Sequence, residues 1–425
     1  MAAAKLSAHA LVAQSPSATL RRDLQVLAAD SLGGRFTGSR EARQAAEYIA
    51  RRFRELGLRP AAAGAYLQPF AVSRNAPAMK ELRVPFALEG VNVAALLPGT
   101  DPTLRDEFVI VGAHYDHLGL GGYGASRDTL VAVHNGADDN ASGTVALFRI
   151  AEQLKRTGTR RSVLFLAFSG EELGLLGSQA YVRSPLEPLA RTVAMVNLDM
   201  VGRLRNGKLI VYGTGTAAEF PTLLDSLNAA RQFDLRKIPD GFGPSDHSSF
   251  FGMKRPVLHL FTDLHDDYHR STDDVEKINF DGLAQVAGFA ADVVRAVANR
   301  RAALTFQDQA AGHGLVAVAP GRADAPASGV APRGGARAWF GSIPDMAGDV
   351  AKGVLFSGVS AGSPAEKAGL MMGDILVRIG DSEIADLQAM TDALNSYKPG
   401  DVARVVVLRG GREHVVDLTF AARAR

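Results

Sequence analysis

Two stretches of this sequence decide its fold: FVIVGAHYD (residues 108–116) and SVLFLAFSGEE (residues 162–172). Each begins with a short, continuous apolar run and ends in imidazole or carboxylate side chains. Continuous apolar runs of this length are typical of strands that are buried on both faces of a parallel sheet. Three more runs of the same kind follow, namely TVAMVNL (192–198), LIVY (209–212) and PVLHLF (256–261). We therefore expect these runs to form the strands of one buried sheet.

Helical patterns separate these runs. An amphipathic pattern over residues 41–56 predicts a helix before the first run, and Gly57 would end it. Further helical periodicity lies at residues 142–156, 171–183, 217–231 and 280–298. Strands that alternate with helices predict an α/β fold in which a mostly parallel, mixed sheet is sandwiched by helices. The Pro- and Ala-rich stretch between the first helix and about residue 90 predicts loops and an edge strand.

The C-terminal part of the chain is organised differently. Residues 310–337 are dominated by Ala, Gly and Pro, a composition that cannot bury a core and indicates a linker. Strand and turn signals resume after it, including GVLFSGV (353–359), DILVRI (374–379) and a Gly410-Gly411 hairpin turn. The chain therefore predicts an α/β catalytic domain over 1–302, a linker over 303–337 and a small β-rich domain over 338–425.

Composition excludes several classes of site. The 47 Lys and Arg residues nearly balance the 45 Asp and Glu residues, and the absence of a basic run argues against a nucleic-acid partner. Cysteine is absent, which excludes disulfides, thiolate metal ligands and a cysteine nucleophile. No stretch approaches the roughly 18 uninterrupted apolar residues of a membrane span. The first ten residues fit either the tail of a trimmed export signal or an ordinary chain start.

Potential metal ligands follow the predicted strands at the point where each strand ends. His114 and Asp116 follow the first run, Glu171 and Glu172 the second, and Asp199 the third. A loop after the last run carries His265 and His269, which spacing alone does not distinguish. Because ligands bind outside the carboxyl ends of strands in open α/β sheets, we expect these side chains to meet at one edge.

A fifth element is the loop GADDNASG (136–143), which carries Asp138 and Asp139. Taken alone, Asp-Asp-Asn before a helix is explained by helix capping. Together with the strand ends, one of its two acids becomes a ligand that bridges a pair of zinc ions. Asp116 is spaced to accept the second ring N–H of a ligating His114. One of the paired glutamates would bind metal, and its neighbour would act as general base.

These residues resemble a known family. The motifs are His114-x-Asp116, Gly136–Gly143, Glu171-Glu172-x-Gly174-x-x-Gly177-Ser178, Asn197-Leu-Asp199-Met200, Ser245-Asp246-His247 and Tyr268-His269-x-x-x-Asp273. In this order they are similar to the two-zinc aminopeptidase family that includes bacterial leucyl aminopeptidases, with glutamate carboxypeptidase and glutaminyl cyclase as relatives. The resemblance spans about residues 90–295.

The resemblance also implies roles. It makes five residues metal ligands for two zinc ions: His114, Asp139 as the bridge, Glu172, Asp199 and His269. It makes Glu171 the general base, and Asp116 the partner of His114. Asp273 would orient His269 or its loop, His247 would lie beside the substrate pocket, and Met200 would line it. The stretch between Gln68 and Leu97 is too short for the lid domain of longer relatives, which implies a more open cleft.

Three further histidines are interpreted as structural. His259 lies inside an apolar run and is expected in the core or on a sheet face. His117 and His134 belong to no motif and are expected on loops or the surface.

The C-terminal domain resembles a bacterial-type PDZ domain. The resemblance rests on AWFGS (338–342), GSPAEKAGL (362–370) and MGDIL (372–376). In PDZ domains a peptide adds as a strand, and its terminal carboxylate is held by backbone N–H groups. Phe340 and Gly341 would form that loop, and a helix near 387–394 would wall the groove. Either a peptide C-terminus or protein partner occupies it, or the domain serves only for packing or dimerisation.

The sequence thus predicts a zinc-dependent exopeptidase that removes N-terminal residues from peptides with a free N-terminus. Two alternatives stay open: a glutaminyl-cyclase-like zinc acyltransferase, and a catalytically silent protein that binds partners through its PDZ domain. Aminopeptidases with an appended PDZ module look like exported bacterial proteins, so the resemblance implies a periplasmic or secreted location.

Overall fold

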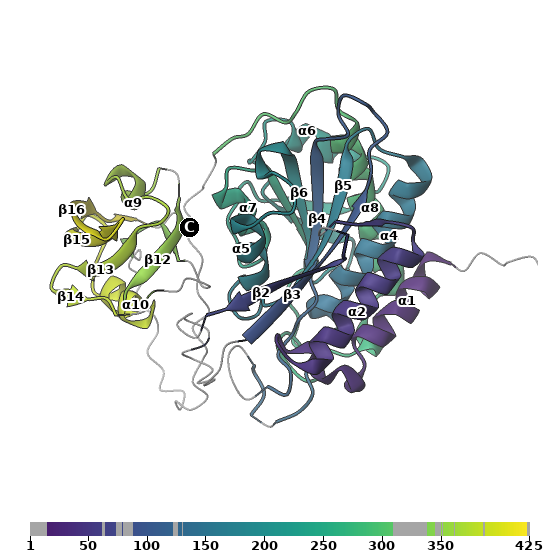
Figure 1. The fold of residues 1–425 in the computed structure, drawn as a ribbon, viewed down its shortest axis with the longest axis horizontal. Helices are drawn as coiled ribbons and strands as arrows, with labels where there is room; N and C mark the ends of the chain where they lie inside the picture. The colour runs from purple at the N-terminus through teal and green to yellow at the C-terminus, as the bar shows by residue number, and fades with distance from the viewer. Residues whose placement is uncertain are drawn as a thin grey trace, which may run out of the picture.

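The chain forms a large α/β unit and a small β-rich unit, which Figure 1 shows beside each other. The computed structural model describes residues 15–61, 64–73, 79, 88–121, 126–129, 131–308, 338–344, 350, 352–360, 362–385 and 387–422. Of the stretch predicted as a linker, 303–337, residues 309–337 lie outside these residues, and Phe306 forms an isolated β-bridge with Ala217 of the larger unit.

The larger unit is built on a nine-stranded sheet. Its strands are β1 (Arg59–Pro60), β2 (Leu67–Val72), β3 (Leu88–Leu97), β4 (Phe108–His114), β5 (Ser162–Phe168), β6 (Thr192–Leu198), β7 (Lys208–Tyr212), β8 (Asp234–Lys237) and β9 (Val257–Phe261). They lie in the order β1-β3-β5-β4-β6-β9-β7-β8, and β2 also pairs with β3. The central strands β5, β4, β6 and β9 are parallel, whereas β3 and β7 flank them antiparallel. The predicted mixed sheet is confirmed, with its parallel strands at the centre.

Helices cover both faces of this sheet (Figure 1). One face carries α1 (Pro16–Leu27), α2 (Arg40–Glu55), α4 (Gly143–Thr157) and α8 (Phe280–Asn299), with α6 (Phe220–Asn228) beside α8. The other face carries α5 (Leu176–Arg183) and α7 (His247–Gly252). Short helical turns are η1 (Asp30–Arg35), η2 (Ala137–Ser142), η3 (Leu189–Arg191) and η4 (Val275–Lys277).

The two faces are packed by alternate residues of each central strand. In β4, Val109 and Val111 join the cluster that includes α1, α2, α4 and α8. Ile110, between them, joins the cluster of Tyr181 and Phe250 on the opposite face. Because successive side chains of a strand point to opposite faces, a continuous apolar run is what such a two-sided core requires.

Most predicted elements match the structure closely, with two helices shorter than predicted. The helix predicted over 171–183 begins only at Leu176, because Gly174 and Leu175 have φ of 100° and 62°, outside the right-handed helical region. The acid pair before it therefore lies in a turn. The helix predicted over 217–231 is limited to Phe220–Asn228. The sequence analysis did not identify α1 or β3 as separate elements.

The small unit contains a six-stranded sheet and a separate two-stranded pair. Its strands are β10 (Ala338–Trp339), β11 (Ser342–Pro344), β12 (Val354–Val359), β13 (Ile375–Ile379), β14 (Ser382–Glu383), β15 (Val402–Arg409), β16 (Arg412–Thr419) and β17 (Ala421–Ala422). Its helices are α9 (Pro364–Lys367) and α10 (Leu387–Asn395). Gly410 and Gly411, both at positive φ, form the tight turn between β15 and β16, as a two-residue hairpin turn requires.

The domain boundaries at 302 and 338 stay a prediction, and the small unit's own core allows a direct test. We expect Ile379→Ala to destabilise the small unit by about 2–5 kcal/mol, because Ile379 is fully buried in its core. Trp339 is the only tryptophan of the chain, so its fluorescence reports this unit. In a urea titration, the fluorescence midpoint should fall while the main far-UV transition stays in place. Ile49→Ala, in α2, should do the reverse; a shift of both transitions in either variant would contradict independent domains.

Among the described residues, no helix combines the length and apolar character that crossing a bilayer needs.

Candidate metal centre

The carboxyl ends of the central strands deliver side chains to one site. His114 is the last residue of β4, Asp199 follows β6, and Glu171 and Glu172 lie in the turn after β5. Asp139 comes from η2, and His269 comes from the loop after β9. Of the five ligands that the family resemblance implies, all are at most 9% exposed except Glu172, which is partly exposed.

Asp139 lies between two groups of donor atoms. Its Oδ1 is 3.3 Å from His114 Nε2, which is also 3.3 Å from Asp199 Oδ1. Its Oδ2 is 3.2 Å from His269 Nε2, which is also 3.3 Å from Glu172 Oε2. Each group thus contains one imidazole and one further carboxylate, and Asp139 contributes one oxygen to each.

These donor groups fit zinc. A tetrahedral zinc ion holds N and O donors at about 2.0–2.1 Å, which places two donors about 3.3 Å apart. The observed separations of 3.2–3.3 Å match that value in both groups. Imidazole and carboxylate are also the donors that remain for zinc in a chain without cysteine.

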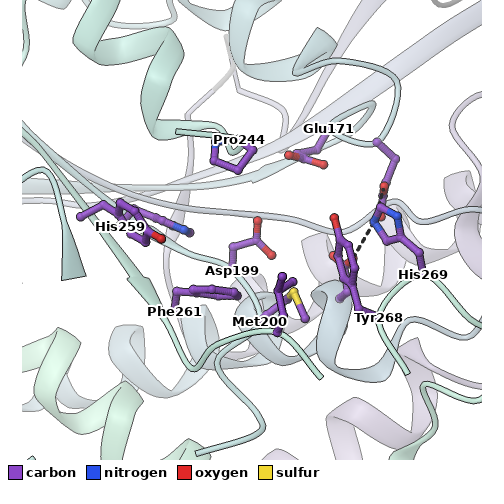
Figure 2. A pocket seen from close by; sticks show the side chains of 12 residues that line it. Glu171, Asp199, Met200, Pro244, His259, Phe261, Tyr268 and His269 are labelled. Atoms are coloured by element: carbon purple, nitrogen blue, oxygen red, sulfur yellow. Dashed lines mark ion pairs between the residues drawn. The ribbon is translucent and has the colours of Figure 1, made fainter. Parts of the chain in front are cut away.

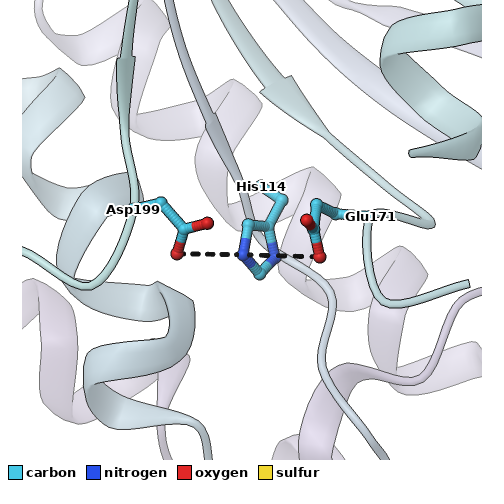
Figure 3. Close-up of side chains that lie close together, drawn as sticks. All are labelled: His114, Glu171 and Asp199. Carbon is cyan, nitrogen blue, oxygen red and sulfur yellow. Dashed lines mark hydrogen bonds and ion pairs between the residues drawn. The ribbon is translucent and has the colours of Figure 1, made fainter. Parts of the chain in front are cut away.

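Glu171 lies next to the first group but farther from it. Its Oε2 is 3.9 Å from His114 Nε2, on the side away from Asp199 in Figure 3. Burial raises the pKa of Glu171 well above its ordinary value, His114 opposes this rise, and the nearby carboxylates Glu172, Asp199 and Asp246 add to it. Glu171 is thus a largely buried carboxyl group, and with His114 and Asp199 it also forms a cluster in which one donor atom of each residue lies within 4.8 Å of the others.

The ligand carboxylates behave differently from Glu171. Burial alone would raise the pKa of Asp139, but its contacts with His114 and His269 hold that pKa well below the ordinary value. Burial and Asp139 also act to raise the pKa of Glu172, yet His269 and His117 lower it to about 2. Both side chains are therefore ionised at neutral pH, as metal ligands must be.

The turn that carries Asp139 is held by its neighbours on two strands. Asp273 Oδ2 accepts the backbone N–H groups of Asp138 (2.8 Å) and Asp139 (3.0 Å), and its Oδ1 pairs with Arg203 at 2.8 Å. In the structure the Asp273 carboxylate thus holds the turn that carries Asp139, and its expected role in orienting His269 or its loop stays a prediction. Asn140 donates to Leu198 O at 2.9 Å, next to Asp199.

Asn140 in this turn both caps α4 and contacts the segment that follows Asp199. Asn140 Oδ1 accepts the N–H of Gly143 at 2.9 Å, which is a cap on α4, and the N–H of Met200 at 3.3 Å. Gly143 must be a glycine, because a Cβ there would lie 2.4 Å from both Asn140 Oδ1 and Leu198 O. The capping explanation for GADDNASG is therefore met by Asn140, and the role of one of its acids as a metal ligand stays a prediction.

The main-chain carbonyl of Asp116 lies closer to the His114 ring than its carboxylate does. His114 Nδ1 lies 3.2 Å from the carbonyl oxygen of Asp116 and 3.7 Å from its carboxylate. The expected contact thus involves the predicted residue but a different atom. The carboxylate instead accepts the Thr37 hydroxyl (3.1 Å) and the backbone N–H of Glu171 (3.2 Å), so it ties the turn that carries Glu171 to the segment after β4.

His117 is a site residue that the sequence analysis assigned to a loop. Its Nδ1 lies 2.6 Å from Glu172 Oε1 and donates to it, which leaves Oε2 directed at His269. The ring is fully buried. In the sequence, His117 stood out only by lying three residues after His114. Neither the two-residue repeat of a strand nor the 3.6-residue repeat of a helix accounts for a histidine at that position.

We expect His117→Ala to weaken zinc binding by about 10–100-fold, the usual effect of removing a group that orients a ligand. Competition with a chelator of known affinity, read by metal content, measures this change. His134→Gln is the matched control, since His134 bonds Ser126 and Ala132 rather than a ligand carboxylate. Equal zinc affinity in wild type and His117→Ala would contradict a positioning role.

Arg35 also escaped the sequence analysis. Its fully buried guanidinium donates to the carbonyl oxygens of Tyr115 (2.6 Å), Leu27 (2.6 Å), Asn135 (2.7 Å) and Gly136 (3.1 Å). Burial lowers the pKa of Arg35 to about 10, against the raising effect of nearby carboxylates, so it stays charged at neutral pH. Arg35 therefore fastens η1 to the two segments that deliver Asp116 and Asp139.

A pocket of about 100 Å³ opens beside the donor groups. Figure 2 shows its lining: Glu171, Asp199 and His269 on the polar part, and Met200, Pro244, His259 and Phe261 on the apolar part. Met200 lies where expected. His259, expected in the core or on a sheet face, is buried in β9 and also lines the pocket.

His247 lies behind this lining rather than in it. Its ring is fully buried and stacks on His259, with centroids 4.5 Å apart and planes at 3°. Burial lowers the pKa of His259 to about 4, so that ring is neutral at the pocket wall.

In the small unit, Phe340 and Gly341 form the predicted bend. The Phe340 ring packs in the core with Phe356 and Phe420, and its carbonyl accepts the N–H of Ala365 at 2.9 Å. Gly341, at φ 90°, accepts the N–H of Ser360 through its carbonyl at 2.7 Å. Whether this bend holds a peptide carboxylate stays a prediction.

Known proteins resemble this chain in both units. Residues 92–294 match the model of peptidase family M28, and residues 341–420 match that of the PDZ domain. Leucine aminopeptidase 1 of Trichophyton rubrum is 27% identical over 230 residues, which cover 48% of this chain and 58% of that protein. Aminopeptidase YwaD of Bacillus subtilis is 29% identical over 214 residues, covering 48% and 44%. The chain thus spans about half the length of the curated relatives that it matches.

Solved structures show the same fold. An aminopeptidase from Aneurinibacillus sp. strain AM-1 has a TM-score of 0.55 at 20% identity, covering 68% of this chain and 96% of that one. Glutaminyl cyclase of Porphyromonas gingivalis has a TM-score of 0.54 at 18% identity, covering 65% and 97%. The chain therefore contains a peptidase family M28 domain over residues 92–294, followed by a PDZ domain over residues 341–420.

Proposed function

We propose that this chain is a zinc aminopeptidase that binds two zinc ions and removes N-terminal residues from peptides. The observation that carries the proposal is the position of Asp139, which offers one carboxylate oxygen to each of two three-residue donor groups. His114 and Asp199 would complete one zinc site, and His269 and Glu172 the other. When bound, the zinc pair polarises the scissile carbonyl and lowers the pKa of water.

Glu171 is the general base in this proposal. It lies at the edge of the donor groups, and its neighbours keep it off them: Asp116 holds its backbone N–H at 3.2 Å. Its carboxylate takes a proton from the attacking water and passes it to the amine that leaves. Burial of Glu171 favours a basic carboxylate, because a raised pKa makes it a stronger proton acceptor once ionised.

The pocket supports removal of single residues from the N-terminus. Its apolar part, with Met200, Phe261 and Leu264, suits an uncharged first side chain. The carboxylates of the polar part suit the free ammonium group of a peptide. A blocked N-terminus would lose that interaction and bury an acetyl group among carboxylates.

A panel of short peptides, free and N-acetylated, tests the proposal on zinc-loaded protein. We expect only the free peptides to be cut, one residue at a time from the N-terminus, with activity lost to a chelator and restored by zinc. Metal analysis should give two zinc ions per chain. Hydrolysis of the acetylated peptides would contradict an aminopeptidase.

Cyclisation of N-terminal glutamine without hydrolysis would instead support the glutaminyl-cyclase alternative. The complete first donor group, with His114 and Asp199, favours the two-ion hydrolase over a one-ion enzyme. Loss of any ligand would have favoured a catalytically silent PDZ protein, and every proposed ligand is present. A periplasmic or secreted location, peptide capture by the PDZ domain and the domain limits at 302 and 338 stay proposals.

A further inference from the structure

Arg127 is a cation at the edge of the metal centre. Its Cζ lies 4.8 Å from the centroid of the Tyr268 ring, and Tyr268 lines the pocket. The Tyr268 ring in turn stacks on His269, with centroids 3.7 Å apart. Arg127 is exposed to solvent, so an incoming molecule can reach it.

The backbone of Arg127 is fixed to the loop that carries His269. Its N–H donates to His269 O at 2.9 Å, and its carbonyl accepts from Arg270 Nη1 at 3.3 Å. The next residue, Asp128, accepts the backbone N–H (2.7 Å) and hydroxyl (2.6 Å) of Ser271. The guanidinium of Arg127 is thus presented from a tethered segment, which reduces the entropy that it loses on binding a ligand.

The charge of Arg127 is not used within the described part of the chain. The nearest carboxylate in sequence, Asp128, is paired with Arg270 at 3.2 Å. Other cations around the site are paired as well: Arg203 with Asp267 and Asp273, and Lys277 with Asp267. Among the described residues, no carboxylate lies within ion-pair distance of Arg127, which leaves its charge for a ligand.

The charge balance of the site indicates what that ligand carries. In the proposed centre, four carboxylates line the pocket and balance the charge of two zinc ions. A peptide brings an ammonium group at one end, which those carboxylates accommodate, and a carboxylate at the other. Arginine binds carboxylates in a planar, two-point geometry, which makes Arg127 the complementary group for the second end.

The direction of the pocket agrees with this assignment. In Figure 2 the apolar residues His259 and Phe261 lie on one side of Asp199, and Tyr268 lies on the other. A peptide with its first side chain in the apolar part and its scissile bond beside Asp199 would continue toward Tyr268 and Arg127.

We propose that Arg127 binds the terminal carboxylate of the substrate, so that the site favours short peptides with a free C-terminus. This inference rests on the proposed function, since it extends the substrate of the same site. It makes Arg127 a specificity residue rather than part of the chemistry.

Direct binding tests this inference without depending on turnover. The zinc-loaded Glu171→Gln protein is titrated by calorimetry with Leu-Leu and with Leu-Leu amide, which lacks the terminal carboxylate. We expect Leu-Leu to bind about 10-fold more tightly, the effect of a hydrogen-bonded charged pair. In the Glu171→Gln/Arg127→Gln protein, the two affinities should become equal.

The matched control is Arg54→Gln in the same background. Arg54 is also an exposed arginine over a tyrosine, 5.3 Å from the Tyr66 ring, but it lies on α2 away from the pocket residues. It should leave the 10-fold preference intact.

A preference that survives Arg127→Gln, a preference absent from the parent protein, or no binding of either peptide would each overturn the role of Arg127. The hydrolysis panel decides the proposed function separately. If the wild type cuts Leu-Leu and Leu-Leu amide with equal kcat/KM, the aminopeptidase stands and only this inference fails.

Discussion

Glu171→Gln is expected to lower kcat by about 10²–10⁴-fold while the protein keeps its zinc, because a positioned general base contributes about that much to the rate. Glutamine has the shape of glutamate but cannot accept the proton of water. Glu171 Oε2 also lies 3.9 Å from His114 Nε2, farther than the carboxylate oxygens of Asp139 and Asp199 at 3.3 Å, so its loss should leave both groups intact. Steady-state hydrolysis of a leucine peptide and metal content of the same sample measure the two effects.

Glu172→Gln provides the contrast for this experiment. Glu172 Oε2 lies 3.3 Å from His269 Nε2 within the second donor group, so this substitution should lower the zinc content as well as the rate. Appreciable turnover in zinc-loaded Glu171→Gln would remove Glu171 from the role of base. Loss of zinc from Glu171→Gln would make it a ligand instead.

Asp139→Ala is expected to lower the zinc affinity of both sites together by more than about 100-fold. This exceeds the roughly 10–100-fold loss that usually follows removal of a residue that only orients a metal ligand. The reason is geometric: Asp139 Oδ1 belongs to the His114 group and Oδ2 to the His269 group. Metal analysis after dialysis against dilute zinc should show far less than one ion per chain. Peptide hydrolysis should fall to background.

Asp138→Asn is the control for Asp139→Ala. Asp138 is the neighbouring buried acid, but its Oδ1 accepts the N–H of Gly202 at 2.6 Å and its Oδ2 faces His265 at 3.2 Å. Two ions per chain should remain in this variant. If Asp139→Ala kept one tightly bound ion, Asp139 would serve a single site and the bridging arrangement would be wrong.

The central strands were predictable because their apolar runs are local. A strand buried on both faces needs apolar residues at every position, and FVIVGA and SVLFLAF meet that need without reference to the rest of the chain. The antiparallel strand β3 was missed since its run, LEGVNVAALL, contains Glu89, Gly90 and Asn92. This segment is a strand because it pairs with β2 and β5, and such pairing cannot be recognised from the hydrophobic pattern of the segment itself.

The candidate ligands were predictable for a related reason. The carboxyl ends of parallel strands meet at one edge, so polar residues after successive apolar runs are brought together by topology alone. Topology did not decide which residue of two neighbouring candidates is the ligand. Asp138 or Asp139, Glu171 or Glu172, and His265 or His269 were distinguished by a family resemblance, and they differ in the structure by which atoms they face.

The groups around the ligands came only from tertiary structure. His117, Arg35 and Arg127 lie in segments without a motif, and each acts through partners that are distant in sequence: Glu172, Gly136 and Tyr268. The contact of the Asp273 carboxylate with the Asp139 turn was also not foreseen, because the two residues are distant in sequence.

The sequence by itself therefore determined the α/β sheet, the PDZ domain and the set of imidazole and carboxylate groups at the strand ends, because these follow from local hydrophobic patterns and from motifs. Tertiary structure alone decided which histidine each oxygen of Asp139 faces, which side chains contact the proposed ligands, and where Arg127 lies, a cation without an ion-pair partner among the described residues. Those features depend on distances between segments up to about 150 residues apart, and such distances are set by the packing of the whole sheet rather than by any local pattern.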